Sequence, residues 1–290
     1  MSDVLTPGID ELRNWIGRTE TVHDTLTPRL ARELTASIGG SDELPALGTP
    51  APYAAHWLLA PHTVTAGRIG ADGHPMRGGF LPPVSLPRRM WAGGSLQFHQ
   101  PLRVGDAVER RTRIADVAMK SGRSGTLCFV TLEHEVFSPR GLAITERQDV
   151  VYRDLAPPPA VVSPAIPAEG PPPAEGPLPE WRREMRADPV LLFRYSAITF
   201  NGHRIHYDRD YAIREEFYPG LVVHGPLQAT LLLGYAAEIL GRHPAAFSFR
   251  GVSPLFDFQN FALMANRNDS GLSLWIEAEN GVRTMQAEAK

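Results

Sequence analysis

The spacing of apolar and polar residues divides the first half of the chain into a helical part followed by strands. Thr27 and Pro28 combine a capping side chain with a proline that suits the first helical position. The sequence predicts a helix from there to about Ile38, ended by Gly39 and Gly40. A second, short helix is expected over residues 53–59.

After Trp91 the pattern becomes typical of strands, because apolar residues alternate with polar ones and β-branched and aromatic residues are frequent. Turn signals follow at 105–106, 121–122 and 139–141. Short antiparallel connections between strands are therefore expected. The predicted strands are residues 95–99, 108–117, 126–137 and 143–152.

The second half repeats this plan around one unusual helix. Residues 226–240 are predicted to be helical, with Gly241 as the stop. Their apolar positions cover nearly the whole circumference, so this helix is expected to be buried on most sides. The predicted strands of this half are residues 193–200, 246–249, 256–265 and 272–278.

A long helix enclosed by an antiparallel sheet is the hot-dog arrangement. Two halves of this kind predict an α+β chain with a double hot-dog fold, in which antiparallel sheet wraps around a long buried helix. A faint internal match supports duplication, since Pro101-Leu102 and Pro254-Leu255 occupy corresponding places before strands.

One proline-rich segment separates the halves. Residues 156–179 hold 10 of the 27 prolines and contain AEGP twice. Proline fixes φ and removes a backbone donor, so we interpret the segment as a semi-extended linker, which need be no more than a spacer. The expected units are residues 1–155, a degenerate hot dog, and residues 180–290, the catalytic hot dog.

Composition excludes several classes of protein. With 29 Lys and Arg against 32 Asp and Glu, the chain lacks the positive charge of a general nucleic-acid binder. The single Cys128 excludes an internal disulfide or a cysteine-based zinc site. No apolar stretch is long enough for a membrane span, and residues 1–18 lack the pattern of a signal peptide. A cytoplasmic protein is expected.

The densest polar cluster lies in residues 199–210, where Asn201, His203, Arg204 and His206 stand close together. The Asn-Gly pair that opens the cluster is typical of a turn that exposes the following residues. The cluster is either a site or a polar loop with two solvated histidines.

A second feature favours a site. The segment 218–226 contains His224 and Gly225 and leads directly into the buried helix. The first N–H groups of a helix are free and lie at the positive end of its dipole, and glycine allows a ligand to approach closely. Gly225 could therefore form an oxyanion hole, although an ordinary Gly-Pro helix start fits equally well.

The segments YSAITFNGHRIHYDRDYA and PGLVVHGPLQATLL resemble the MaoC-like hydratase/dehydratase superfamily. More closely, they are similar to the branch with mitochondrial-type 3-hydroxyacyl-thioester dehydratase 2 and mesaconyl-C4-CoA (3-methylfumaryl-CoA) hydratase. The resemblance is specific over residues 195–232 and loose in the first half. It implies a long two-hot-dog chain with a degenerate N-terminal half.

The resemblance also implies roles for individual residues. The superfamily motif places an Asp five positions before a His; here these positions are Asn201 and His206. The carboxylate is thus replaced by an amide, which cannot accept a proton from water. His206 is expected to activate water and shuttle protons, Asn201 to orient the water, and the Gly225 N–H to polarise a thioester carbonyl.

Four further residues are candidates for substrate binding. Arg204 could pair with a substrate carboxylate, although pairing with Asp208 or Asp210 is favoured. Arg250 could contact coenzyme A phosphates or be solvated. His203 and His224 complete the set, and His224 could simply pack before the helix.

The expected reaction is reversible addition of water to a 2-enoyl thioester, with a mesaconyl-C4-CoA hydratase favoured. Alternatives are a 3-hydroxyacyl dehydratase of fatty-acid synthesis, a non-catalytic acyl-CoA-binding protein and, less favoured, a thioesterase. No metal or cofactor is expected beyond coenzyme A in the substrate. The first half is expected to shape the acyl pocket through Trp57, Trp91 and His99. A homo-oligomer is possible through edge strands.

Overall fold

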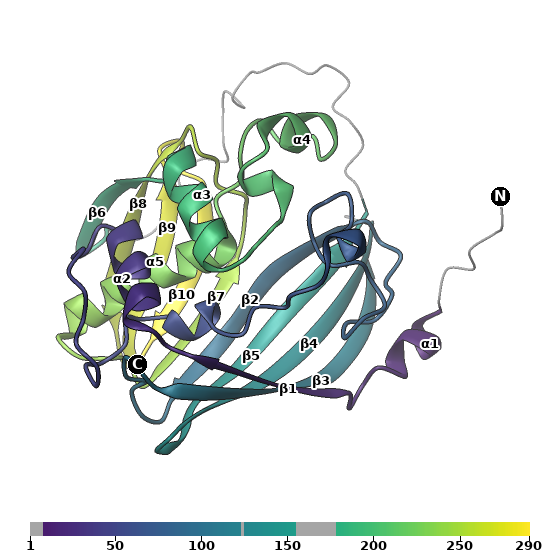
Figure 1. Ribbon diagram of the computed structural model, residues 1–290. Helices are drawn as coiled ribbons and strands as arrows, with labels where there is room; N and C mark the ends of the chain where they lie inside the picture. Colours follow the sequence, from purple (N-terminus) through teal and green to yellow (C-terminus); the bar gives the residue numbers. More distant parts are fainter. Residues whose placement is uncertain (1–7, 123–124, 155–177) are drawn as a thin grey trace.

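The computed structural model describes residues 8–122, 125–154 and 178–290, and their strands form one ten-stranded antiparallel sheet (Figure 1). The strand order is β1-β3-β4-β5-β2-β7-β10-β9-β8-β6. The strands of the first half are β1 (Thr19–Thr25), β2 (Arg88–Phe98), β3 (Ala107–Gly122), β4 (Gly125–Ser138) and β5 (Gly141–Arg153). Those of the second half are β6 (Trp181–Arg186), β7 (Ala246–Gly251), β8 (Asn260–Asn268), β9 (Gly271–Ala278) and β10 (Arg283–Ala289).

The sheet has an internal two-fold pattern. Its order reads the same from either end when β1–β5 are exchanged for β6–β10, and the halves meet where β2 pairs with β7. The matching Pro-Leu pairs follow β2 and β7, so they fall at equivalent connections. The expected α+β double hot-dog architecture is thus present.

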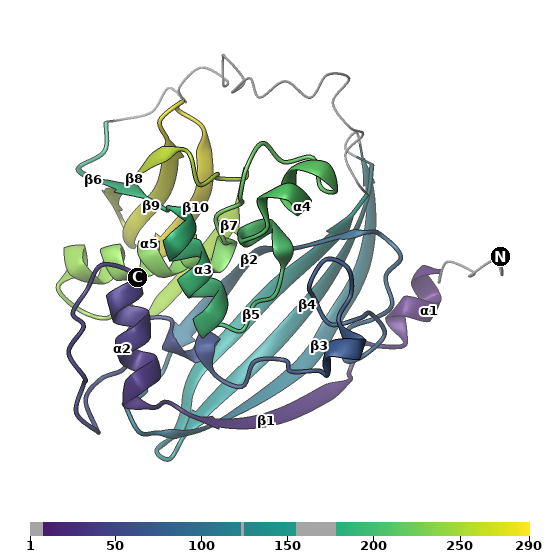
Figure 2. The same cartoon turned by 45° about the horizontal axis from the view of Figure 1, so that its top comes forward.

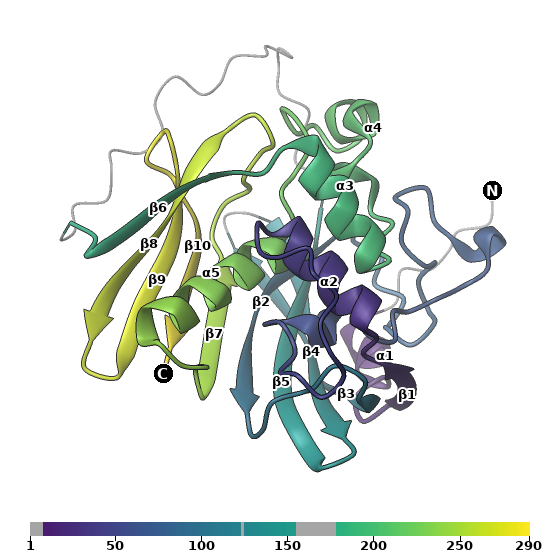
Figure 3. The same ribbon diagram turned by 60° about the vertical axis from the view of Figure 1, so that its left-hand side comes forward.

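The predicted long helix is α5 (Gly225–Leu240), and ten of its residues are buried. It packs against β2 and β7–β10, as Figure 3 shows. The other α-helices are α1 (Ile9–Arg13), α2 (Pro28–Ser37), α3 (Pro189–Ile198) and α4 (Arg209–Arg214). Three 3₁₀ helices complete the set: η1 (Ala55–Leu58), η2 (Ala66–Arg68) and η3 (Arg204–His206).

Helix α2 confirms the prediction from Thr27 and Pro28. The Thr27 hydroxyl accepts a hydrogen bond from the Leu30 N–H at 3.2 Å, which satisfies one of the free donors of the first turn. The short helix expected at 53–59 is η1.

The prediction of a strand at 193–200 is wrong, because residues 193–198 lie in α3 and residues 199–200 form the turn that follows it. Asp188 caps the helix by accepting from the Leu191 N–H at 2.9 Å, and Pro189 occupies the first turn. Buried Leu192 and Tyr195 are three positions apart, which is helical spacing. The predictions also missed β1, β6 and β10; β6 is mostly polar and lies at an edge of the sheet.

The first half lacks a long central helix among the described residues, whose longest helix there is α2 with ten residues. Figure 2 shows β2–β5 as one curved layer, with the connections of the first half across its concave face. The predicted linker lies outside the described residues over 156–177. Within the described part of the chain, no helix is long and apolar enough to cross a membrane.

Candidate active site

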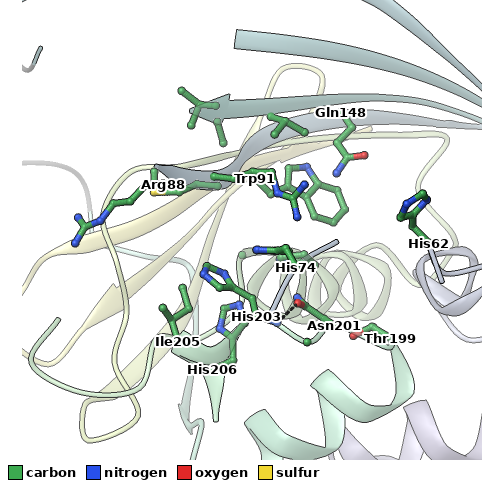
Figure 4. Close-up of a pocket in the computed structure, with 18 of the residues that line it drawn as sticks. His62, His74, Arg88, Trp91, Gln148, Thr199, Asn201, His203, Ile205 and His206 are labelled. Carbon is green, nitrogen blue, oxygen red and sulfur yellow. Dashed lines mark hydrogen bonds between the residues drawn. The ribbon is translucent and has the colours of Figure 1, made fainter. Parts of the chain in front are cut away.

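A cavity of about 1310 Å³ lies between the inner face of β2–β5 and the loops that precede α5 (Figure 4). Apolar side chains such as Trp91, Leu127 and Phe129 line the part formed by the first half. Asn201, His203, His206 and Gly225 line the part formed by the second half; Figure 4 shows the first three beneath Trp91. The cavity therefore joins the predicted catalytic segment to the sheet that was expected to shape the acyl pocket.

Asn201 begins a tight loop after α3. Phe200 has φ 52°, in the left-handed region, and this turn reverses the chain. The Asn201 side-chain oxygen then accepts from the His203 N–H at 3.0 Å, the dashed line of Figure 4. A backbone N–H donates to the amide oxygen and cannot donate to the amide nitrogen, so this bond distinguishes the side-chain oxygen of Asn201 from its nitrogen. The Asn201 amide NH₂ group remains available as a donor.

His206 is fixed in one tautomer. Its Nδ1 lies 2.7 Å from the Val222 carbonyl oxygen, and since a carbonyl only accepts, Nδ1 carries the proton. Burial lowers the pKa of His206 well below 6.5, and charge on His224 and His203 lowers it further. The ring is therefore neutral near pH 7, with Nε2 as its proton acceptor.

His224 lies behind His206 and does not line the cavity. It is fully buried, and its ring stacks on that of His206 with centroids 3.6 Å apart. Its Nε2 is 2.8 Å from the Ser196 hydroxyl, while Nδ1 is buried without a hydrogen-bond partner among the described residues. His224 therefore packs behind the His206 ring and does not face the cavity, where it had been expected to bind substrate.

His203 lines the cavity and contacts a carboxylate that the sequence analysis did not identify. Its Nε2 lies 3.1 Å from Glu216 Oε1. Glu216 is also 3.5 Å from Arg88 Nε and accepts from the Tyr211 hydroxyl at 3.4 Å. His203 and His206 were expected to be exposed by the Asn-Gly turn, and that was wrong: both are buried.

A loop of the first half explains this burial, because it docks directly onto the 201–204 segment. The Asp72 carbonyl accepts from the Arg204 N–H at 2.9 Å. A Cβ added to Gly73 would lie 1.8 Å from the Gly202 carbonyl oxygen, so the two backbones touch. The same loop brings the His74 ring within 4.2 Å of the His203 ring.

Asp72, His74 and His203 lie close enough to share a metal ion, with candidate ligand atoms within 4.8 Å of one another. Hydrogen bonding accounts for their positions without an ion, because Asp72 Oδ2 is 3.1 Å from His74 Nδ1 and His203 contacts Glu216. Burial lowers the pKa of His74 to about 3. Burial alone would raise the pKa of Asp72, but its bond to His74 keeps it below the usual value. The expectation of no metal stays a prediction.

Gly225 is the first residue of α5, with His224 as its N-cap. Pro226 has no N–H, so Gly225 supplies the first free donor at the positive end of the helix. A Cβ on Gly225 would meet only the Trp91 carbonyl oxygen, at 3.6 Å, so the protein leaves this point open. The acidic residue of α5, Glu238, pairs with Arg183 and is distant from this end.

Of the two arginines expected to bind substrate, only Arg250 lines the cavity. Arg204 does not line the cavity: its guanidinium is 2.7 Å from Asp208 Oδ2 and donates to the Ala71 carbonyl at 3.0 Å. It therefore braces the loop, as the pairing alternative expected. Arg250 lines the cavity and is 3.4 Å from Gln286 Oε1, which leaves donors free for a ligand.

Of the three residues expected in the core or acyl pocket, Trp57, Trp91 and His99, the two tryptophans lie at or next to the cavity and His99 does not. Trp91 lines the cavity, and Trp57 packs edge-on against it at 5.1 Å between centroids. His99 is exposed, bonds to Thr145 and does not line the cavity, so its expected place in the core or pocket was wrong.

Sequence reasoning missed Glu216, Arg88 and His74. Arg88 and Glu216 are 128 positions apart, and only the fold brings them together. For His74, the nearby Asp72 was a weak signal, because a carboxylate beside a histidine often orients its ring.

Comparisons with known proteins show the family to which the chain belongs. Residues 54–257 match the family model of hydroxyacyl-thioester dehydratase type 2. The chain is 43% identical over 273 residues to mesaconyl-C(4)-CoA hydratase of Chloroflexus aurantiacus, covering 94% of this chain and 95% of that protein. It is 28% identical over 251 residues to the mitochondrial hydroxyacyl-thioester dehydratase type 2 of Schizosaccharomyces pombe, covering 77% and 79%.

A solved structure supports the fold. A conserved hypothetical protein of Mycobacterium tuberculosis, described as a double hot dog, superposes with a TM-score of 0.55 at 15% identity. The superposition covers 98% of this chain and 97% of that one. The predicted fold class and the predicted resemblance are both confirmed.

Proposed function

Because the chain belongs to the hydroxyacyl-thioester dehydratase type 2 family, we propose that it catalyses the reversible addition of water to a 2-enoyl thioester. We further propose mesaconyl-C4-CoA (3-methylfumaryl-CoA) as the substrate class. The high identity to a hydratase of that compound over nearly the whole length of both chains supports this choice.

One observation carries the chemistry: a neutral imidazole with a free Nε2 lines the same cavity as an open helix N-terminus. His206 holds its proton on Nδ1 and accepts at Nε2. The Gly225 N–H provides a donor for the thioester oxygen. A hydration reaction needs both a base for water and a stabiliser for the enolate.

The steps follow from these positions. His206 Nε2 takes a proton from water as the water oxygen bonds to Cβ. The π electrons move to the thioester oxygen, where the Gly225 N–H and the dipole of α5 stabilise the negative charge. A proton is then delivered to Cα. Asn201 lacks a carboxylate, and its NH₂ group orients the reactants.

The charge of the cavity favours an anionic acyl group. Among the arginines that line it, Arg77 and Arg110 donate to backbone carbonyls, and Arg88 donates to the Glu216 carbonyl. Arg89 has none of the ion pairs found among the described residues and lies opposite Tyr152 across the β2–β5 ladder. A 3-methylfumaryl group carries a carboxylate on Cβ, which a guanidinium matches.

A second candidate is a 3-hydroxyacyl thioester dehydratase of fatty-acid synthesis. The size of the cavity, about 1310 Å³, and the apolar side chains of β4 and β5 favour it, since both suit a long acyl chain. The chemistry is the same reaction run backward, so the substrate distinguishes the two.

The test is an assay of the purified protein with mesaconyl-C4-CoA, crotonyl-CoA and a long-chain 2-enoyl-CoA, following loss of the enoyl-thioester absorbance. We expect fastest turnover of mesaconyl-C4-CoA and a loss of about 10²- to 10⁴-fold in His206→Ala. His99→Ala, at an exposed histidine away from the cavity, is the matched control and should retain full activity.

Binding of acyl-CoA without turnover of any enoyl thioester would instead identify a non-catalytic acyl-CoA-binding protein. Preference for the long-chain substrate would identify the second candidate.

A further inference from the structure

His203 and Glu216 form a buried pair beside the cavity. His203 Nε2 lies 3.1 Å from Glu216 Oε1, and each residue is 6% exposed. An ionised carboxylate can only accept, so His203 Nε2 donates. The other ring nitrogen, Nδ1, is then the atom that His203 can offer to a ligand in the cavity that it lines.

Glu216 is kept in place by groups from both halves of the chain. Arg88 on β2 lies 3.5 Å from Oε2 and also donates to the Glu216 backbone carbonyl. The Tyr211 hydroxyl donates to Oε1 at 3.4 Å. The Arg88 guanidinium in turn lies 4.8 Å from the centre of the Tyr218 ring. One oxygen of the Glu216 carboxylate therefore faces Arg88 and the other faces His203.

The other titratable groups around His203 differ from Glu216. His206 and His74 present neutral rings at 5.5 Å and 4.2 Å, because burial holds the pKa of each below its usual value. Asp72 is hydrogen-bonded to His74. Charge on His203 further lowers the pKa of His206 and His224, so a proton on His203 opposes one on either neighbour.

We propose that Glu216 is a positioning residue that holds the His203 ring by its Nε2–H, with Nδ1 directed to the substrate, so that His203 is the group that protonates Cα. This proposal rests on the hydration reaction proposed above. It divides the work between two histidines that stand in opposite environments: neutral His206 faces water, and carboxylate-bound His203 faces Cα.

The proton and electron balance is closed. The water O–H bond breaks, its proton goes to His206 Nε2 and its oxygen bonds to Cβ. The proton then passes from His206 through water to His203 Nδ1, and the enolate electrons form a bond between Cα and this proton. Both rings are left as they began, with His203 Nε2 still donating to Glu216, and no oxidant or reductant is needed.

The experiment compares Glu216→Gln with Glu215→Gln in the full chain. Glu215 is the neighbouring exposed carboxylate, so this control removes the same charge outside the site. Steady-state rates are measured from pH 5 to 10 on the best thioester substrate, and folding is checked by thermal unfolding. Glu216→Gln keeps an acceptor for Nε2–H but removes the negative charge.

We expect kcat to fall about 10²-fold in Glu216→Gln, with KM changed far less, as for loss of a general acid. The alkaline limb of the kcat profile should move to lower pH by about one unit, because the protonated ring has lost its counter-charge. Glu215→Gln should match the unaltered protein. A purely structural role would lower the amount of folded protein and leave the pH profile in place, which would overturn the proposal.

A second variant covers the case in which Glu216→Gln does not fold. His203→Gln leaves the Glu216–Arg88 pair intact and should lose kcat to the same extent; full activity would overturn the proposal. If the unaltered protein turns over no thioester, the proposed function fails by itself. The charge state of His203 is then read by ¹⁵N NMR, where Glu216→Gln should deprotonate the ring at lower pH than Glu215→Gln.

Discussion

The imidazole rings of His206 and His224 stack with centroids 3.6 Å apart and 19° between their planes. A proton on either ring would place a positive charge directly against the other in a buried site, which is costly. Burial first, and then the charge interaction with His224, therefore keep His206 neutral, as a base for water requires. His224 takes part through this contact, although it does not line the cavity.

The buried histidines predict a pH-dependent stability. The pKa values of His224 and His74 are lowered from 6.5 to about 3, and that of His206 is also lowered. The unfolded chain therefore binds protons below about pH 6.5 that the folded chain does not, so the free energy of unfolding should be highest above this pH and decrease as the pH falls toward 3. Each histidine contributes a slope of about 1.4 kcal/mol per pH unit.

Urea denaturation between pH 7.5 and 4.5 measures this slope. His224→Phe keeps an aromatic ring against His206 and should reduce the slope by about one proton. A free energy of unfolding that stays constant over this range would contradict the prediction.

Gly225→Ala should lower the catalytic rate without lowering the thermal stability of the protein. The added Cβ would meet only the Trp91 carbonyl oxygen, at 3.6 Å, so the thermal midpoint should stay within about 2 °C of the original. The methyl group would crowd the thioester at the start of α5, and kcat/KM should fall about 10- to 10³-fold. Unchanged kinetics would remove Gly225 from the oxyanion hole.

Asn201 has two functions that substitution can separate. Asn201→Asp keeps the oxygen that accepts from the His203 N–H but removes the NH₂ group, whereas Asn201→Ala removes both. We expect Asn201→Asp to remain as stable as the original and to lose activity, and Asn201→Ala to lose about 1 kcal/mol of stability as well. Full activity of Asn201→Asp would show that the amide orients nothing in the reaction.

Arg89→Met tests the proposed recognition of a substrate carboxylate. With an apolar side chain of similar length, kcat/KM for mesaconyl-C4-CoA should fall about 100-fold, because a charge-assisted hydrogen bond is lost. The value for crotonyl-CoA, which has no carboxylate, should change less than about threefold. If either substrate is hydrated too slowly to measure, the inhibition constants of succinyl-CoA, which has a carboxylate, and butyryl-CoA, which has none, are compared instead. An equal loss for both substrates would contradict the prediction.

Gly73→Ala tests whether the first half completes the site. Gly73 and Gly78 have similar φ values, +87° and +82°, so alanine strains the backbone equally at both. Only at position 73 would the Cβ collide with the Gly202 carbonyl oxygen. Gly73→Ala should therefore displace the loop from His203 and lower kcat, while Gly78→Ala should affect stability alone. Equal activity of the two variants would show that this contact is dispensable.

The sequence by itself determined the features that depend on neighbouring residues. Capping and proline chemistry located the start of α2, and the continuous apolar circumference of α5 predicted its burial. The spacing of Asn201 and His206 and the Gly225-Pro226 helix start pointed to residues that line one cavity, because they lie within one loop and one helical turn.

Only the tertiary structure decided which groups surround that segment. The short apolar run at 193–200 fits a strand or a helix equally well, and packing within the full chain selected α3. Arg88, Glu216 and His74 joined the site through the pairing of the halves, over separations at which local patterns carry no information. The depressed pKa values of the histidines likewise arise from burial, which is a property of the folded chain alone.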